Sequence, residues 1–135
     1  MEKSLVLIKP DAVERNIIGE IISRYEENDL KIVDLKMKKI SKEFAYKHYE
    51  EHIGKGFFKE LIEFITRSSL CALILEGENA IEKVRGINGS TNPKEAKEGT
   101  IRNLYAKNKT ENCVHASDSR DSAKREINLW FGQSL

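Results

Sequence analysis

Hydrophobic and polar positions follow two different periods along the N-terminal part of the chain. Residues 4–9 form an apolar run that stops at Pro10, which predicts a short buried strand. Residues 16–28 carry isoleucines and a tyrosine at helical spacing and predict an amphipathic helix. Residues 33–38 alternate between apolar and charged side chains, which is typical of a strand with one face in water. This part is therefore predicted to fold as strand, helix, strand.

The middle of the chain predicts two helices, a strand and a further helix. Ser41 is a good N-cap for a short helix. A break at residues 52–56 separates that helix from a second one, whose apolar face runs from Phe57 to Ile65. Residues 70–75 form an apolar run and predict a second buried strand, and residues 80–87 have helical spacing again.

The C-terminal part contains a long loop and then a short strand before the last helix. Residues 86–100 are rich in glycine, asparagine and proline, and loops of this length in small domains are often functional. A short helical stretch at residues 101–106 precedes a brief strand at residues 113–115. Residues 117–119 give a strong N-cap signal for the last helix. The apolar side of that helix carries Ala123, Ile127, Trp130 and Phe131.

This order of elements predicts an α+β sandwich on the ferredoxin-like βαββαβ plan, with a four-stranded antiparallel sheet and surrounding helices. The chain has 135 residues, which suits one domain over residues 1–135. Hydrophobic residues make up 39%, enough for a core, and the net charge of +1 offers no long-range attraction to nucleic acid or membranes.

Cysteine usage and the N-terminus indicate where the protein works. Cys71 and Cys113 lie in apolar contexts, which favours two reduced, packed thiols over a disulfide or a zinc site. The N-terminal apolar run is too short for a signal peptide. The longest apolar run, residues 70–75, is far below the ~20 residues that span a bilayer. We therefore expect a cytoplasmic protein.

His115 is the first candidate for chemistry, because it ends an apolar strand just before a capped helix. The free N–H groups of a helix N-terminus favour a bound phosphate, and imidazole is a competent nucleophile near neutral pH. This local context alone fits a structural histidine better than a catalytic one. Three basic residues shift the balance, since Lys9, Arg85 and Arg102 sit at strand ends or beside the long loop. Phosphoryl transfer needs this kind of positive charge on the phosphates.

Nucleotide-binding and zinc-binding motifs give two other readings of the chain. The chain lacks GxxxxGK[ST] and GxGxxG, so any nucleotide must be held by dispersed side chains and helix ends. His48 to His52 matches HxxEH, in which two histidines could bind zinc, Glu51 could activate a water and Glu126 could add a third ligand. Against this reading, the segment is polar and its helix breaks at Gly54.

Taken together, these motifs resemble the nucleoside diphosphate kinase family over essentially the whole chain. The matching segments are, in order, residues 7–13, 19–22, 48–49, 57–58, 91–93, 99–102 and 112–119. The last segment fits the family signature N-x-x-H-[GA]-S-D-S, whose histidine carries the phosphate. Glu126 and Trp130-Phe131 fit the family's closing helix.

The resemblance implies a role for each matched residue. His115 would be the nucleophile, with Glu126 and Ser117 orienting it. The other implied contacts are Lys9 and Asn112 with the sugar hydroxyls and the transferring phosphate, Tyr49 close to that phosphate, Arg85, Thr91 and Arg102 with the β- and γ-phosphates, and Phe57 with Leu61 at the base. No side chain would bind metal directly; Mg²⁺ would bridge the nucleotide phosphates, with Asp118 reaching it through water.

The resemblance also implies what the protein does and with what. It predicts a ping-pong transfer of the γ-phosphate of ATP or another triphosphate to a nucleoside diphosphate, maintaining the pools of NTPs and dNTPs. It predicts a homo-tetramer or homo-hexamer, with no membrane and no nucleic acid required. Ala116 in place of a usual glycine and the poorly matched residues 103–111 depart from the family's common pattern. The zinc hydrolase and a non-catalytic nucleotide- or protein-binding module remain as alternatives.

Overall fold

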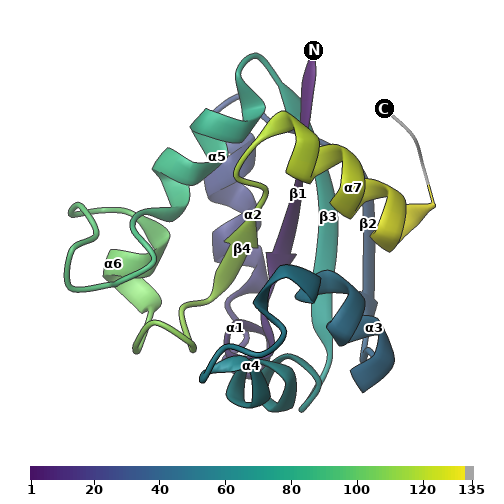
Figure 1. Cartoon of the computed structure of the whole chain (residues 1–135). Helices are drawn as coiled ribbons and strands as arrows, with labels where there is room; N and C mark the ends of the chain where they lie inside the picture. Colours follow the sequence, from purple (N-terminus) through teal and green to yellow (C-terminus); the bar gives the residue numbers. More distant parts are fainter. Residues whose placement is uncertain (133–135) are drawn as a thin grey trace.

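A four-stranded antiparallel sheet forms the centre of the computed structural model, which describes residues 1–132 (Figure 1). The strands lie in the order β2-β3-β1-β4. They are β1 (Glu2–Ile8), β2 (Lys31–Lys38), β3 (Leu70–Gly77) and β4 (Val114–Ala116). The helices are α1 (Pro10–Glu14), α2 (Ile18–Glu27), α3 (Lys42–His48), the 3-10 helix η1 (Glu50–His52), α4 (Phe58–Ile65), α5 (Ala80–Asn88), α6 (Ile101–Tyr105) and α7 (Arg120–Phe131). The predicted α+β architecture is confirmed.

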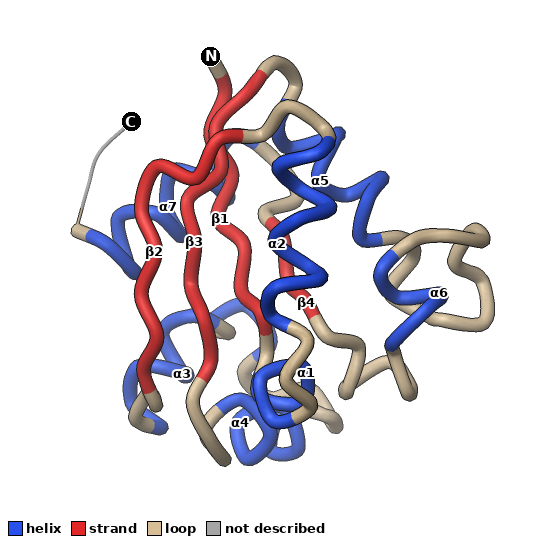
Figure 2. Tube along the Cα trace, turned by 180° about the vertical axis from the view of Figure 1, so that it is seen from behind, coloured by secondary structure: helices blue, strands red, loops and turns tan. Residues whose placement is uncertain are grey.

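The sheet is buried on both faces because alternate residues of its central strands point to opposite helix layers. Leu5 and Leu7 of β1 belong to the core cluster that includes residues of α3, α4 and α7. Val6 and Ile8 belong to the cluster that includes residues of α2, α5 and α6. Figure 2 shows α2 crossing one face of the sheet, with α7 and α3 behind it. This two-sided burial explains why β1 and β3 have continuous apolar runs.

Several element boundaries differ from the sequence prediction. Pro10 was expected to end the strand in a turn, but it begins α1, because proline at the first helical position loses no hydrogen bond. The helix predicted over residues 16–28 begins later, at Ile18, since Asn16 has a φ of 60°. Helix α5 extends to Asn88 and so shortens the predicted loop, and β4 is shifted by one residue from the predicted strand.

The short strand β4 fixes the direction of His115. Leu7 pairs with His115 across β1 and β4, so the imidazole lies on the same face as α3 and α7. Cys113, just before the strand, has a φ of 75°, which is uncommon for a residue with a side chain. Its N–H donates to the Asp11 carboxylate at 3.1 Å, and its carbonyl accepts from the Lys9 N–H at 2.8 Å. These bonds hold the strand entry in place.

The state of the two thiols agrees with the sequence prediction. Cys71 and Cys113 are both buried and both free, as predicted. Within residues 1–132, no helix is both long enough and apolar enough to cross a bilayer.

Candidate active site

A cavity of about 610 Å³ opens beside β4, and its wall is formed by residues from most parts of the chain. The wall contains nearly all of the residues that the sequence selected: Lys9, Tyr49, Phe57, Leu61, Arg85, Thr91, Arg102, Asn112, His115, Asp118 and Glu126. Ser117 is the exception, since it is fully buried and lies behind Glu126. Folding therefore brings the predicted set together, while the role of each residue stays a prediction.

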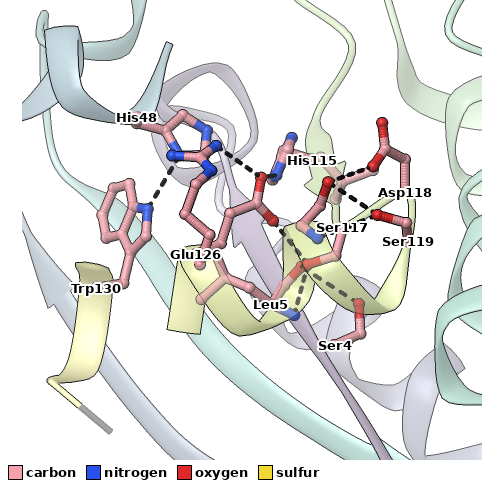
Figure 3. A network of polar contacts seen from close by, with 12 residues as sticks. Ser4, Leu5, His48, His115, Ser117, Asp118, Ser119, Glu126 and Trp130 are labelled. Carbon is pink, nitrogen blue, oxygen red and sulfur yellow. Dashed lines mark hydrogen bonds and ion pairs between the residues drawn. The ribbon is translucent and has the colours of Figure 1, made fainter. Parts of the chain in front are cut away.

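His115 is held by a chain of hydrogen bonds that leads back into the sheet (Figure 3). Its Nε2 lies 3.1 Å from Glu126 Oε2, and the Ser117 hydroxyl donates to Glu126 Oε1 at 2.7 Å. The backbone N–H of Leu5 donates to the Ser117 oxygen at 3.1 Å. Because α7 carries Glu126 and β4 carries His115, the pair also joins the last helix to the edge of the sheet.

The charge on Glu126 decides which nitrogen of His115 carries the proton. Burial alone would raise the pKa of Glu126, but its bonds with His115 and Ser117 outweigh this and the pKa is lowered. An ionised carboxylate only accepts hydrogen bonds, so Nε2 must carry the proton. The lone pair of the neutral ring then lies on Nδ1. The side chain of His115 is 23% exposed, and it forms part of the cavity wall.

A second histidine packs against His115 but is held in a different state. His48 is 3% exposed, and its ring meets the His115 ring edge-on at 4.8 Å between centroids. The Trp130 Nε1–H donates to His48 Nδ1 at 3.1 Å, so the neutral ring carries its proton on Nε2. Burial and the neighbouring His115 lower the pKa of His48 well below its usual range. His48 therefore acts as a neutral packing partner.

The zinc-hydrolase alternative is wrong for this fold. Helix α3 ends at His48, and His52 lies in η1 with its Nδ1 3.0 Å from Lys55 Nζ. Within residues 1–132, the potential metal ligands that converge are His48, His115 and Glu126, not Glu51 or His52. A metal on His48 Nε2 would force a proton onto Nδ1, which already accepts from Trp130. The residues of the HxxEH match therefore do not form a zinc site in this fold.

Lys9 is buried beneath the cavity and is connected to two loops through one asparagine. The Lys9 side chain is 7% exposed, and its Nζ donates to Asn112 Oδ1 at 2.9 Å. The amide of Asn112 donates to the carbonyls of Thr91 and Lys109, at 3.2 Å and 3.0 Å. Burial, with Arg102 nearby, lowers the pKa of Lys9 to about 8. Lys9 is thus a desolvated cation that an anion in the cavity would stabilise.

Arg102 supplies a second desolvated charge, and backbone carbonyls fix its position. Its Nη1 donates to Gly89 O at 2.8 Å and its Nη2 to Val114 O at 2.7 Å. Burial lowers the pKa of Arg102, and Arg85 adds repulsion. Gly89 has a φ of 88°, and a Cβ there would lie 2.4 Å from Thr100 Oγ1, so this turn requires glycine.

The cavity has an apolar part at its mouth, in contrast to the part lined by Lys9, Arg85 and Arg102. Phe57 is 47% exposed and shares the wall with Leu61. An exposed aromatic ring at a cavity mouth offers a flat face for stacking. Tyr49 is 7% exposed, and burial raises the pKa of its phenol, which therefore stays protonated. The cavity can thus hold a molecule that is planar at one end and anionic at the other.

Sequence reasoning missed some residues of this site. Asn88, Lys109, Thr110 and Ser122 line the cavity, and His48 and Trp130 pack behind His115. Asn88 lies three positions after Arg85 on α5, and this helical spacing could have identified it. His48 and Trp130 are far apart in the chain, so no local pattern connects them.

Comparison with known proteins places the chain in one family. The family model described as nucleoside diphosphate kinase matches residues 2–135. A nucleoside diphosphate kinase of Clostridium perfringens strain 13 is 64% identical over 131 residues, covering 97% of this chain and 92% of that protein. One from Saccharolobus islandicus strain M.16.4 is 49% identical over 134 residues, covering 99% and 97%.

Solved structures with the same fold belong to proteins with the same name. The apo nucleoside diphosphate kinase from Encephalitozoon cuniculi is similar with a TM-score of 0.96 and 35% identity, covering 98% of this chain and 90% of that one. A halophilic one from Halobacterium salinarum, solved in complex with CDP, has a TM-score of 0.95 and 40% identity, covering 98% and 88%.

The lowered pKa of Lys9 predicts that this side chain adds to the stability of the free protein as the pH rises from about 7.5 to about 9.5. The pKa of an unfolded lysine is about 10.4, whereas the pKa of Lys9 in the fold is about 8. Between these values the unfolded chain binds more protons, so raising the pH favours the folded state. We expect the free energy of unfolding to rise by about 2 kcal/mol more in the wild type than in Lys9→Met. Urea denaturation of both proteins measures this difference, and an equal pH response would contradict it.

Proposed function

The chain belongs to the nucleoside diphosphate kinase family, and from this premise we propose that it transfers the γ-phosphate of a nucleoside triphosphate to a nucleoside diphosphate through a phosphorylated His115. The observation that carries the proposal is the bond between His115 Nε2 and the ionised Glu126, 3.1 Å long. It leaves the Nδ1 lone pair available in a cavity whose far end is cationic.

In the first half-reaction, Nδ1 of His115 attacks the γ-phosphorus of the bound triphosphate. The N–P bond forms as the bond from phosphorus to the bridging oxygen breaks, and the diphosphate leaves with that electron pair. The proton on Nε2 stays in place, so the ring becomes cationic as the N–P bond forms. The Glu126 carboxylate stabilises this charge, and the Ser117 hydroxyl keeps the carboxylate aligned.

The second half-reaction is the reverse with a different nucleotide. A terminal phosphate oxygen of the incoming diphosphate attacks the phosphorus on His115, and Nδ1 recovers its lone pair. No proton is gained or lost over the cycle. Because donor and acceptor differ only in base and sugar, the equilibrium constant is close to one. Such exchange lets ATP supply the other NTPs and dNTPs.

The phosphate end of the site would act through charge and positioning. Phosphoryl transfer disperses negative charge over the transferring oxygens, and fixed cations stabilise it. Arg85, Arg102 and the Thr91 hydroxyl are the groups for the β- and γ-phosphates, with Tyr49 beside the transferring group. Lys9 is already desolvated, so a phosphate neutralises a charge that burial had made costly.

The sugar and the base would be held with little selectivity. Lys9 and Asn112 are the groups for the sugar hydroxyls, although the Asn112 amide also ties the Thr91 and Lys109 loops together. Phe57 would stack on the base with Leu61 beside it. Stacking accepts any base because every base has an aromatic face.

Mg²⁺ is the cofactor that this site would accept, carried by the nucleotide. Asp118 is an exposed carboxylate of the cavity wall, and its pKa is lowered by a hydrogen bond from Ser122 and by the charge of Arg85. Carboxylate and phosphate oxygens are the hard ligands that Mg²⁺ prefers, and the ion keeps several waters. Asp118 would reach it through one of these waters. When bound, Mg²⁺ would neutralise phosphate charge.

Assembly into a homo-tetramer or homo-hexamer forms a further part of the proposal. Strand β2 is an edge strand, and Val33, Leu35 and Met37 on it are 40%, 43% and 51% exposed. An apolar sheet edge invites pairing with another strand. A second copy of the chain would cover this edge.

Incubation with γ-labelled ATP and Mg²⁺, followed by unlabelled GDP, tests the covalent mechanism. We expect an acid-labile, base-stable label on His115 that the chase carries to GTP. In His115→Ala, turnover should fall by at least about 10³-fold, because the nucleophile is lost. Circular dichroism should be unchanged. A well-folded His115→Ala protein with appreciable phosphotransfer would refute the mechanism, and an unlabelled wild type would favour a nucleotide-binding module.

Phe57→Ala should weaken nucleotide binding but leave the chemistry in place. Loss of one base–aromatic stack costs about 1–3 kcal/mol, so we expect KM for nucleotides to rise by about tenfold with a much smaller change in kcat. Tyr46→Ala is the matched control, since Tyr46 is also exposed (45%) and is not among the cavity residues. An unchanged KM in Phe57→Ala would argue against stacking.

Leu35→Glu should dissociate the assembly, because it puts a charge into the apolar edge of β2. Size-exclusion chromatography with light scattering measures the mass of the wild type and the variant. Ile53→Glu serves as the control, since Ile53 is 60% exposed and lies after η1. A monomeric wild type, or a variant with unchanged mass, would contradict the proposed interface.

A further inference from the structure

Helices α2 and α5 lie side by side on one face of the sheet (Figure 2), and a buried pair of polar side chains joins them. Tyr25 is fully buried, and Asn88, the last residue of α5, is 1% exposed. The Tyr25 hydroxyl donates to Asn88 Oδ1 at 2.6 Å. Burial raises the pKa of Tyr25, so the phenol keeps the proton that it donates. The Tyr25 hydroxyl therefore fixes the orientation of the Asn88 amide.

The other end of the Asn88 amide has no partner within residues 1–132. Its Nδ2 is buried and makes no hydrogen bond there, and the same holds for Arg102 Nε. Both residues form part of the cavity wall. The remaining nitrogens of Arg102 are bonded to the carbonyls of Gly89 and Val114, so Nε is the donor left over. Leaving a buried donor unpaired is costly, and native folds retain few such groups without a reason.

The two unpaired nitrogens of the cavity wall share one chemical property, since both can only donate. A partner that satisfies both must accept hydrogen bonds, and a negative charge suits the neighbouring cations. Arg85 lies three positions before Asn88 on α5, so the two side chains leave the helix on the same side. Phosphate oxygens accept several hydrogen bonds and carry the required charge.

We propose that Asn88 is an additional phosphate-binding residue, whose amide donates to an oxygen of the terminal phosphate of a nucleoside diphosphate while Tyr25 fixes the orientation of the amide. Because Oδ1 accepts from Tyr25, Nδ2 is the end of the amide that is left for the ligand. This inference rests on the proposed function and assigns one more donor to its phosphate site.

The double variant Tyr25→Phe/Asn88→Leu tests the role without leaving a polar group unpaired. Replacing both partners with apolar groups of similar shape is close to neutral for stability, so the melting temperature should not fall. A hydrogen bond to a charged group is strong enough that we expect the Kd of ADP to rise by about tenfold. The Kd of AMP, which lacks the β-phosphate, should stay unchanged. Isothermal titration in Mg²⁺ measures both.

Asn128→Leu is the matched control, because Asn128 lies exposed on α7 and is not among the cavity residues. Its Kd for ADP should equal that of the wild type. An unchanged Kd for ADP in the double variant, or an equal loss for ADP and AMP, would overturn the assignment. Should the double variant not fold, Tyr25→Phe alone should still raise the Kd of ADP by about threefold, and no change would overturn the assignment.

Labelling of His115 by γ-labelled ATP separates this inference from the proposed function. If the wild type is labelled and transfers the label to GDP, the kinase reaction is established independently of the role of Asn88. If the wild type is not labelled, the kinase mechanism fails, and the ADP and AMP affinities still decide whether Asn88 contacts the β-phosphate.

Discussion

The buried carboxylate of Glu126 is the group on which the candidate site depends. It is 4% exposed, and its bonds with His115 and Ser117, together with nearby positive charge, outweigh the cost of burying it as an anion. Those two partners come from the edge of the sheet, and Ser117 in turn accepts from the Leu5 backbone. The hydrogen bonds that stabilise this one charge therefore connect α7, β4 and β1. The charge of Glu126 also decides that His115 carries its proton on Nε2. The bond between His115 and Glu126 therefore both joins the last helix to the sheet and sets the protonation of the imidazole.

Opposite this anion, the fold keeps two cations partly stripped of water. Burial lowers the pKa of both Lys9 and Arg102, and Arg85 adds to the positive field. Backbone carbonyls and Asn112 hold these side chains before any ligand is present. In the proposed reaction, such a preformed cationic end would lower the reorganisation needed when phosphates bind. The buried Asn88 Nδ2, which has no hydrogen-bond partner among residues 1–132, fits the same design as one more donor.

His48 illustrates how the fold changes the meaning of a motif. In the sequence it begins an HxxEH match, and two histidines four positions apart on a helix could bind a metal. The helix ends at His48, so His52 does not lie one helical turn after it on the same face. His52 lies in η1, and its ring nitrogen contacts Lys55. Trp130 then fixes the tautomer of His48. A residue that looked like a ligand is therefore a neutral support for the ring of His115.

The sequence by itself determined the element order, the antiparallel α+β fold and the position of His115 before a capped helix, because these follow from local periodicity and capping. Its family motifs also selected residues that almost all lie in the cavity wall, but they missed others there, such as Asn88 and Ser122. The tertiary structure alone decided what those residues touch. The bonds of Trp130 to His48 and of Tyr25 to Asn88 join positions far apart in the chain, so no local pattern encodes them. Burial, which sets the pKa of each charge, is likewise a property of the packed chain.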